Sequence, residues 1–134
     1  MFENIIKNVK NKINLTDDEI KTFTEILDFQ KISKKTILLQ EGEVCRFEGY
    51  INSGAIRIYY VNENGFEVTL SFAIEDWWVA DLASFTEQLP SKLNIETLED
   101  CEMFMLTPET KEELLAIGPT FDRFCRLLLQ RNLE

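Results

Sequence analysis

The feature that most constrains the fold is a run of strand-forming residues interrupted by a tight-turn signal. Residues 55–61 are rich in β-branched and aromatic side chains, and residues 62–65 are turn formers. Asn64-Gly65 favours a hairpin because both residues tolerate positive φ. From Phe66 to Ile74, apolar residues alternate with small or polar ones, which predicts a strand with one face in a core. An isolated hairpin is marginal in water, so we expect other elements to cover that face.

Size and composition predict a single globular domain over residues 1–134. We expect no membrane association, because no apolar run approaches the roughly 18 residues that a span needs. The first residues lack a basic leader followed by an apolar block, so we expect no secretory signal. The three cysteines are odd in number and share no short spacing, which indicates free thiols and a cytoplasmic location.

The charge distribution argues against nucleic-acid binding by this domain. The net charge is −10, and residues 36–122 carry seventeen carboxylates. The same segment has four cations, which are Arg46, Arg57, Lys92 and Lys111. Such a surface repels phosphate, so we expect no direct contact with DNA or RNA.

The sequence lacks histidine and the motifs that most often carry catalysis. The chain has no histidine, which removes the commonest metal ligand and most general-base chemistry. The sequence also has no phosphate-binding loop of the GxxxxGK[ST] type and no nucleophile–base pair that we can identify. We therefore expect no enzymatic activity, no metal and no cofactor.

Periodicity along the chain predicts helices at both ends and strands between them. Apolar residues from Phe2 to Ile13 have helical spacing, and Thr16 with Glu19 forms a capping box for a second helix reaching about Phe29. We expect these N-terminal helices within residues 1–30. Six to eight short strands then follow within residues 31–107, which is typical of a β-sandwich, roll or barrel. Thr107 and Pro108 begin the C-terminal helices, at residues 108–134.

The last helix has apolar residues on more than one side, so more than one side must be buried. We interpret it as a dimerisation helix of a homodimer; the alternative is complete burial within one chain. No Gly or Pro follows the leucines of this helix before the last residue, so we expect the native helix to continue beyond Glu134. The predicted interface residues are Phe121, Phe124, Cys125, Leu128 and Leu129.

Four segments together resemble successive signatures of the cyclic-nucleotide-binding domain in the sensor half of bacterial Crp/Fnr-type transcription regulators. They are residues 41–44, 50–58, 64–67 and 98–102, and the likeness extends from about Leu15 to Glu134. The resemblance implies a mainly β jelly roll (a double-stranded β-helix) with N-terminal helices and a long C-terminal helix.

The phosphate cassette implied by the resemblance is degenerate in this chain. In the family, a short helix N-terminus and an arginine hold the phosphate, and an acidic residue holds the ribose. Here Ala80 replaces the glycine, Ser91 falls on the arginine position, and Lys92 is one residue away. We therefore expect no binding of cyclic AMP. The matching candidate positions are Ala80, Asp81, Leu82, Ala83, Ser91, Lys92 and Leu93.

Trp77 and Trp78 leave two interpretations open, because they could line an apolar ligand cavity or pack in the core. The resemblance implies a regulatory sensor or effector-binding domain of a Crp/Fnr-like transcription regulator. Its effector, if one exists, would be an unknown small molecule. DNA would be bound only through a C-terminal domain that this chain does not contain. The alternative is a stand-alone ligand- or protein-binding module that kept the roll and lost the nucleotide.

Overall fold

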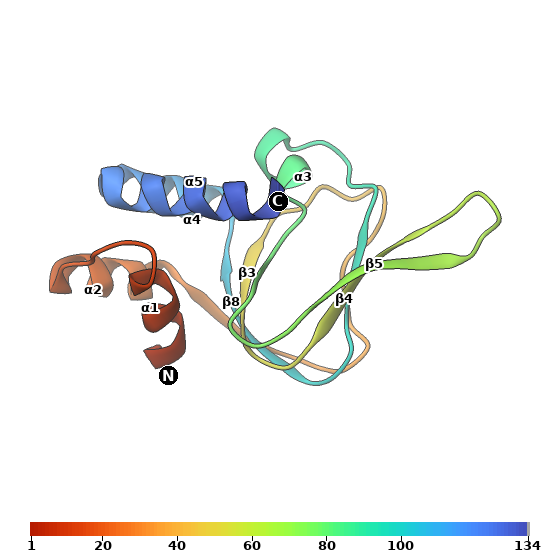
Figure 1. The fold of residues 1–134 in the computed structure, drawn as a ribbon, viewed down its shortest axis with the longest axis horizontal. Coiled ribbons are helices and arrows are strands. Elements are labelled where there is room, and N and C mark those ends of the chain that lie inside the picture. The colour runs from red at the N-terminus through yellow and green to blue at the C-terminus, as the bar shows by residue number, and fades with distance from the viewer. Residues whose placement is uncertain (134) are drawn as a thin grey trace.

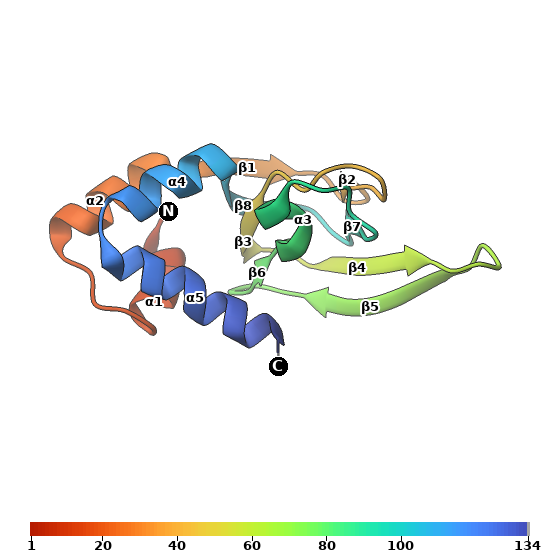
Figure 2. The same cartoon turned by 90° about the horizontal axis from the view of Figure 1, so that it is seen from above.

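The computed structural model describes residues 1–133, and the side chains of residues 1–128. Four helices gather at one end of the molecule and a β-roll forms the other, with a long hairpin projecting from the roll (Figures 1 and 2). The helices are α1 (Glu3–Lys10), α2 (Asp17–Ile26), α3 (Leu82–Glu87), α4 (Pro108–Ala116) and α5 (Pro119–Leu133). The strands are β1 (Asp28–Ile32), β2 (Ile37–Leu39), β3 (Glu48–Ser53), β4 (Ile56–Val61), β5 (Glu67–Ala73), β6 (Trp78–Val79), β7 (Asn94–Thr97) and β8 (Cys101–Leu106).

The strands form two antiparallel sheets of four, in the orders β1-β8-β3-β6 and β2-β7-β4-β5. Helices α1, α2, α4 and α5 lie outside the first sheet, and α3 connects β6 to β7 at the rim of the roll (Figure 2). This arrangement confirms the predicted mainly β roll with N-terminal helices and a long C-terminal helix.

The helix starts follow the capping signals in the sequence. The Thr16 hydroxyl accepts from the Glu19 backbone N–H, and the Glu19 carboxylate accepts from the Thr16 N–H, which satisfies two helix-end donors. Thr107 caps α4 in the same way with Thr110, and Pro108 occupies the first helical position. The predicted boundaries of α2 and α4 are therefore right at their N-termini.

Two apolar cores lie on opposite faces of the first sheet. One core lies between that sheet and the helices, where Phe23 and Phe121 stack with ring centroids 5.5 Å apart. The other lies between the two sheets and contains Ile51, Ile56 and Met103. Both faces of the first sheet are thus buried. Within residues 1–133, no helix combines the length and apolar character needed to cross a bilayer.

The predicted buried face of the hairpin is wrong, although the hairpin itself is confirmed. Phe66 is 68% exposed and Phe72 is 58% exposed, and Leu70 and Ile74 are exposed with them. Strand β5 lies at the edge of its sheet, and a register shift leaves Leu70 as an extra residue opposite β4. Alternation shows that the two faces of a strand differ, but it does not show which face meets the core.

The predicted end of the N-terminal helices is also wrong. Helix α2 ends at Ile26 instead of near Phe29, and the roll begins at Asp28 instead of residue 31. Residues 28–32 pair with Met105 to Cys101 of β8. This pairing is non-local and overrides the short helical pattern in the sequence.

We predict that Gly54→Ala lowers the free energy of unfolding by roughly 2–4 kcal/mol, because it adds backbone strain and a steric clash. Gly54 has φ +108°, and a Cβ there would lie 2.5 Å from Cys101 Sγ and 2.8 Å from the Asp100 carbonyl oxygen. Urea denaturation measures the change. The matched control is Gly65→Ala at φ +83°, where no atom lies within 4 Å of the added Cβ. Equal losses in the two variants would contradict the clash.

Candidate functional site

The segment that matches the phosphate cassette forms the short helix α3 and its flanks. Asp81 is the N-cap, with φ −89° and ψ 95°, and its carboxylate accepts from the Ser84 N–H at 3.2 Å. Gln88 ends the helix in the left-handed conformation, with φ 55°. The helix is therefore bounded by a side-chain cap, which its sequence favours, and by a left-handed glutamine, which its sequence does not favour.

The two candidate positions that would meet the ribose and the phosphate are bonded to each other. Ser91 Oγ donates to Asp81 Oδ2 at 2.6 Å, and the Leu93 N–H donates to Ser91 Oγ at 3.0 Å. Ser91 is only 3% exposed. The Asp81 carboxylate thus has a partner on each oxygen, one on α3 and one on the segment that enters β7.

The remaining candidate positions do not converge on this pair. Lys92 and Ala83 are exposed, and Ala80 and Leu82 are half-buried. Ala80 and Leu82 do line one small cavity of about 10 Å³ together with Trp78, which is about the size of a single water. Of the seven candidates, the structure brings Asp81, Ser91 and Leu93 into direct contact.

Ser84 connects α3 to the loop before β3. Its hydroxyl donates to the Leu89 carbonyl at 2.5 Å and accepts from the Cys45 N–H at 2.8 Å. Ser84 and Cys45 are both buried, and this burial raises the pKa of the Cys45 thiol. The helix is therefore held at its centre as well as at its ends.

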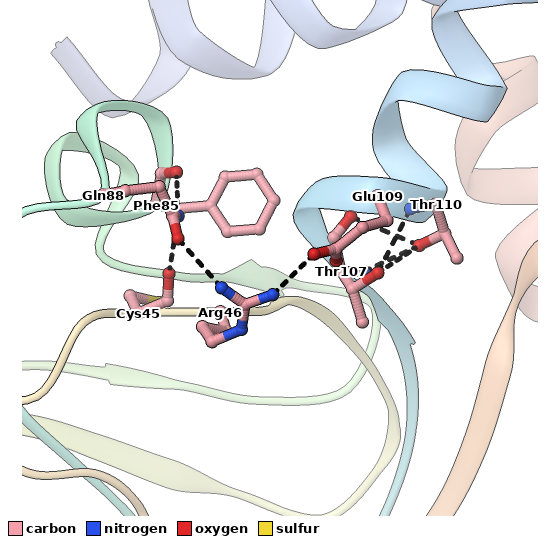
Figure 3. Close-up of polar contacts among 7 residues, drawn as sticks. All are labelled: Cys45, Arg46, Phe85, Gln88, Thr107, Glu109 and Thr110. Atoms are coloured by element: carbon pink, nitrogen blue, oxygen red, sulfur yellow. Dashed lines mark hydrogen bonds and ion pairs between the residues drawn. The ribbon is translucent and has the colours of Figure 1, made fainter.

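Arg46 joins α3 to the start of α4 (Figure 3). Its Nη1 donates to Gln88 Oε1 at 3.2 Å, and its Nη2 donates to Glu109 Oε1 at 2.6 Å. Backbone hydrogen bonding at the start of α4, and then Arg46, hold the pKa of Glu109 below its usual value. Both ions are largely exposed, so the pair positions the two helices more than it stabilises them.

A second ion pair lies deeper between the same elements. Lys111 Nζ on α4 binds Glu48 Oε1 on β3, and the same ammonium lies 5.2 Å from the Phe85 ring centroid of α3. Glu48 is buried and Lys111 is half-buried. Removing one partner of such a pair leaves a buried charge unpaired, which is costly. Phe85 and Lys111 thus add an interior contact between α3 and α4.

Sequence reasoning missed this network, although one signal for it was visible. Of the four cations in the acidic segment, Arg46, Arg57 and Lys111 each pair with glutamate carboxylates. The fourth, Lys92, is exposed and forms no ion pair within the described residues. The scarcity of cations among many carboxylates was thus the one signal in the sequence for these ion pairs, although it does not identify the partners.

The aromatic candidates belong to the core between the first sheet and the helices. Trp78 lies 5.5 Å from the Tyr50 ring and 5.8 Å from the Phe124 ring of α5, while its Nε1–H donates to Asn8 Oδ1 at 2.8 Å. Trp77 is exposed. Of the two interpretations, core packing therefore describes Trp78. The described residues contain no cluster of three or more potential metal-ligating side chains, and the three cysteines are free.

The predicted interface residues on α5 mostly face their own chain. Phe121, Phe124 and Leu128 are buried in the core beneath the helices, and Cys125 is half-buried, with burial raising its pKa to about 11. The side chain of Leu129 lies outside the described residues. A homodimer remains a prediction, and it would have to use other side chains than these three.

Comparison with known proteins identifies the family to which the chain belongs. A family model described as the cyclic nucleotide-binding domain matches residues 29–117, which is more than half of the chain. The chain belongs to the cyclic nucleotide-binding domain family. The match covers all eight strands except the first residue of β1, together with α3 and α4.

Several solved structures share this fold at low sequence identity. The Thermus thermophilus catabolite activator protein superposes with a TM-score of 0.80 at 17% identity, over 94% of this chain and 58% of the Thermus chain. A cyclic nucleotide-binding domain from Methylobacillus flagellatus KT gives 0.84 at 18%, over 98% of this chain and 78% of the other. The sensor domain of the Pseudomonas aeruginosa transcriptional regulator DNR gives 0.73 at 15%, over 99% and 91%. No curated protein sequence matches the chain.

We predict that Asp81 and Ser91 are energetically coupled. Asp81→Ala removes the α3 cap and the Ser91 partner, so it lowers the free energy of unfolding by about 1–2 kcal/mol. We expect the double variant Asp81→Ala with Ser91→Ala to lose about 1 kcal/mol less unfolding free energy than the two single variants lose together. Urea denaturation of the four proteins measures this cycle. Glu87→Ala, at an exposed position of the same helix, is the control; strict additivity of the Asp81 and Ser91 losses would contradict the coupling.

Proposed function

We propose that this domain is the regulatory sensor of a Crp/Fnr-like transcription regulator, and that its cassette does not bind cyclic AMP. The hydrogen bond between Ser91 and Asp81 carries the proposal, because the two positions needed for the phosphate and the ribose satisfy each other. The fold likeness to the DNR sensor domain supports the regulatory part. DNA binding would belong to a part of the regulator beyond this chain.

Electrostatics at the cassette oppose a bound phosphate. The family arginine is replaced by a buried serine, and the nearest cation in sequence, Lys92, is exposed to solvent. A phosphate placed there would meet the Asp81 carboxylate without a guanidinium to neutralise it. Burying an unpaired charge of this kind costs several kcal/mol, which is comparable to the whole binding energy of a millimolar ligand.

We also propose a homodimer that uses α5 and the exposed apolar face of β5. A contiguous exposed apolar surface marks an interaction site in a soluble protein. Four exposed apolar side chains lie in β5 or directly next to its ends, and they are Phe66, Leu70, Phe72 and Ile74. On α5, Cys125 and Leu127 are still half-buried and can bury further area. A second copy of the chain supplies the same surfaces, so a two-fold interface can cover both.

We predict that the purified domain shows no saturable binding of cyclic AMP up to about 1 mM, since the site offers less than about 4 kcal/mol of favourable free energy. Isothermal titration calorimetry measures this, with a cyclic-AMP-binding family member as the positive control. A micromolar dissociation constant that Asp81→Ala abolishes would contradict the proposed loss of nucleotide binding.

We predict that Leu70→Thr together with Phe72→Thr converts the homodimer to a monomer. The two substitutions remove roughly 3–6 kcal/mol of apolar burial from the interface, while threonine keeps the strand propensity. Light scattering gives the mass, and circular dichroism confirms the fold. The control is Thr69→Ser with Ser71→Thr on the same strand. A monomeric wild-type domain, or a dimer unaffected by the substitutions, would reject this interface.

A further inference from the structure

A polar cavity lies between α1 and the first sheet, away from the cassette. Its volume is about 250 Å³, and none of its lining residues belongs to α3 or to the seven cassette candidates. One wall is α1 and the other is formed by β3 and the turn before β6. The lining residues are Asn4, Lys7, Asn8, Asn11, Tyr50, Asn52, Glu75 and Asp76.

The two walls carry opposite charge. Asn4, Lys7 and Asn11 share one face of α1, because their spacing follows the helical period. Glu75 and Asp76 line the opposite wall. Among the described side chains, Lys7 makes no ion pair within 4 Å with either carboxylate. A cation and two anions, all three exposed to solvent, therefore line the same cavity without forming an ion pair with each other.

The acidic wall is held in place by a hydrogen-bond network. Asp76 has a left-handed backbone with φ 72°, and its Oδ1 accepts from Tyr50 OH at 2.7 Å and from Asn8 Nδ2 at 3.1 Å. Burial, and then the bond to Asp76, raise the pKa of Tyr50, so its hydroxyl stays protonated and donates. The carboxylate is thus fixed before any ligand arrives, which reduces the cost of ordering it on binding.

One acceptor at this cavity has no partner within the described residues. The Oδ1 of Asn52 is buried and accepts no hydrogen bond, while its Nδ2 donates to Glu102 Oε1 at 3.4 Å. Buried polar atoms are nearly always paired, because leaving one unpaired costs roughly 1–3 kcal/mol. The wall that carries Asn52 and the two carboxylates is therefore rich in hydrogen-bond acceptors, which favours an occupant that donates hydrogen bonds.

We propose that this cavity binds a small zwitterion of the free α-amino acid class. The ammonium lies on the wall of Glu75, Asp76 and Asn52, and the carboxylate lies on the wall of Lys7 with the amides of α1. The volume suits a ligand of this size, since it is below the range of about 300–1,000 Å³ that is usual for drug-sized molecules. A divalent cation is disfavoured, because the described lining has two carboxylates only.

This binding does not depend on the proposed regulatory function, but the structure connects the cavity to α5. Asn8, which binds Asp76 through its Nδ2, accepts from the indole of Trp78 through its Oδ1. Trp78 in turn packs edge-on against Phe124 of α5. Trp77 and Trp78 are the only tryptophans in the sequence. Ligand binding at the cavity therefore has a direct fluorescence readout.

The test is a tryptophan-fluorescence titration with each of the twenty common L-amino acids, repeated for any positive by calorimetry. We expect saturable binding of at least one amino acid. Its N-acetyl derivative and its carboxamide each remove one charge, and each binds at least about tenfold more weakly, which is a loss of about 1.4 kcal/mol. Lys7→Met and Glu75→Gln weaken binding by a similar factor.

The controls are Lys10→Met and Glu63→Gln, which remove the same charges at exposed positions outside the cavity and leave the affinity unchanged. Three results would overturn the proposal: no saturable binding of any amino acid up to about 10 mM, equal affinity for the carboxamide, or unchanged affinity in both cavity variants. The cyclic AMP titration and the measured mass test the proposed function separately, so failure of one proposal is distinguishable from failure of the other.

Discussion

Strand β8 is buried on both faces, and the rest of the structure depends on this burial. Phe104 and Leu106 pack into the core beneath the helices, whereas Met103 and Met105 pack into the core between the sheets. Successive side chains of a strand point to opposite faces, so one strand serves two cores. The first sheet is therefore a shared wall, and the helices on one side and the second sheet on the other are both positioned against it (Figure 1).

This arrangement explains which parts of the fold were predictable from the sequence. The sequence predicted six to eight short strands within residues 31–107, and the structure has eight strands, of which β8 (Cys101–Leu106) carries apolar residues on both faces. Local signals such as the Thr16 cap and the Asn64-Gly65 turn also gave correct elements. Strand β1 and the exposed face of β5 were missed, because both depend on which segments pair across the sheet. Pairing between residues 28 and 105 leaves no local signal in the chain.

For the candidate site, too, the sequence predicted some features and not others. Its position followed from the resemblance, since residues 80–83 form the start of α3 and residues 91–93 follow that helix. Its contacts did not follow, because Arg46 reaches Glu109 and Lys111 reaches Glu48 across 63 residues of sequence. Ion pairs of this kind depend on the relative placement of α4 and the roll, which the sequence does not encode locally. The bond between Asp81 and Ser91 likewise required coordinates, although the loss of the arginine was visible without them.

The polar cavity and the cassette lie at the two ends of a short segment that contains β6. Asp76 lies in the cavity wall and Asp81 caps α3, with residues 77–80 between them. Two of these four residues, Trp78 and Val79, are held in register with Tyr50 and Gly49 of β3. Trp78 therefore lies between the two carboxylates along the chain, and its ring contacts Phe124 of α5. The terminal helix is in this way linked by direct contacts to the segment that joins the cavity to the cassette.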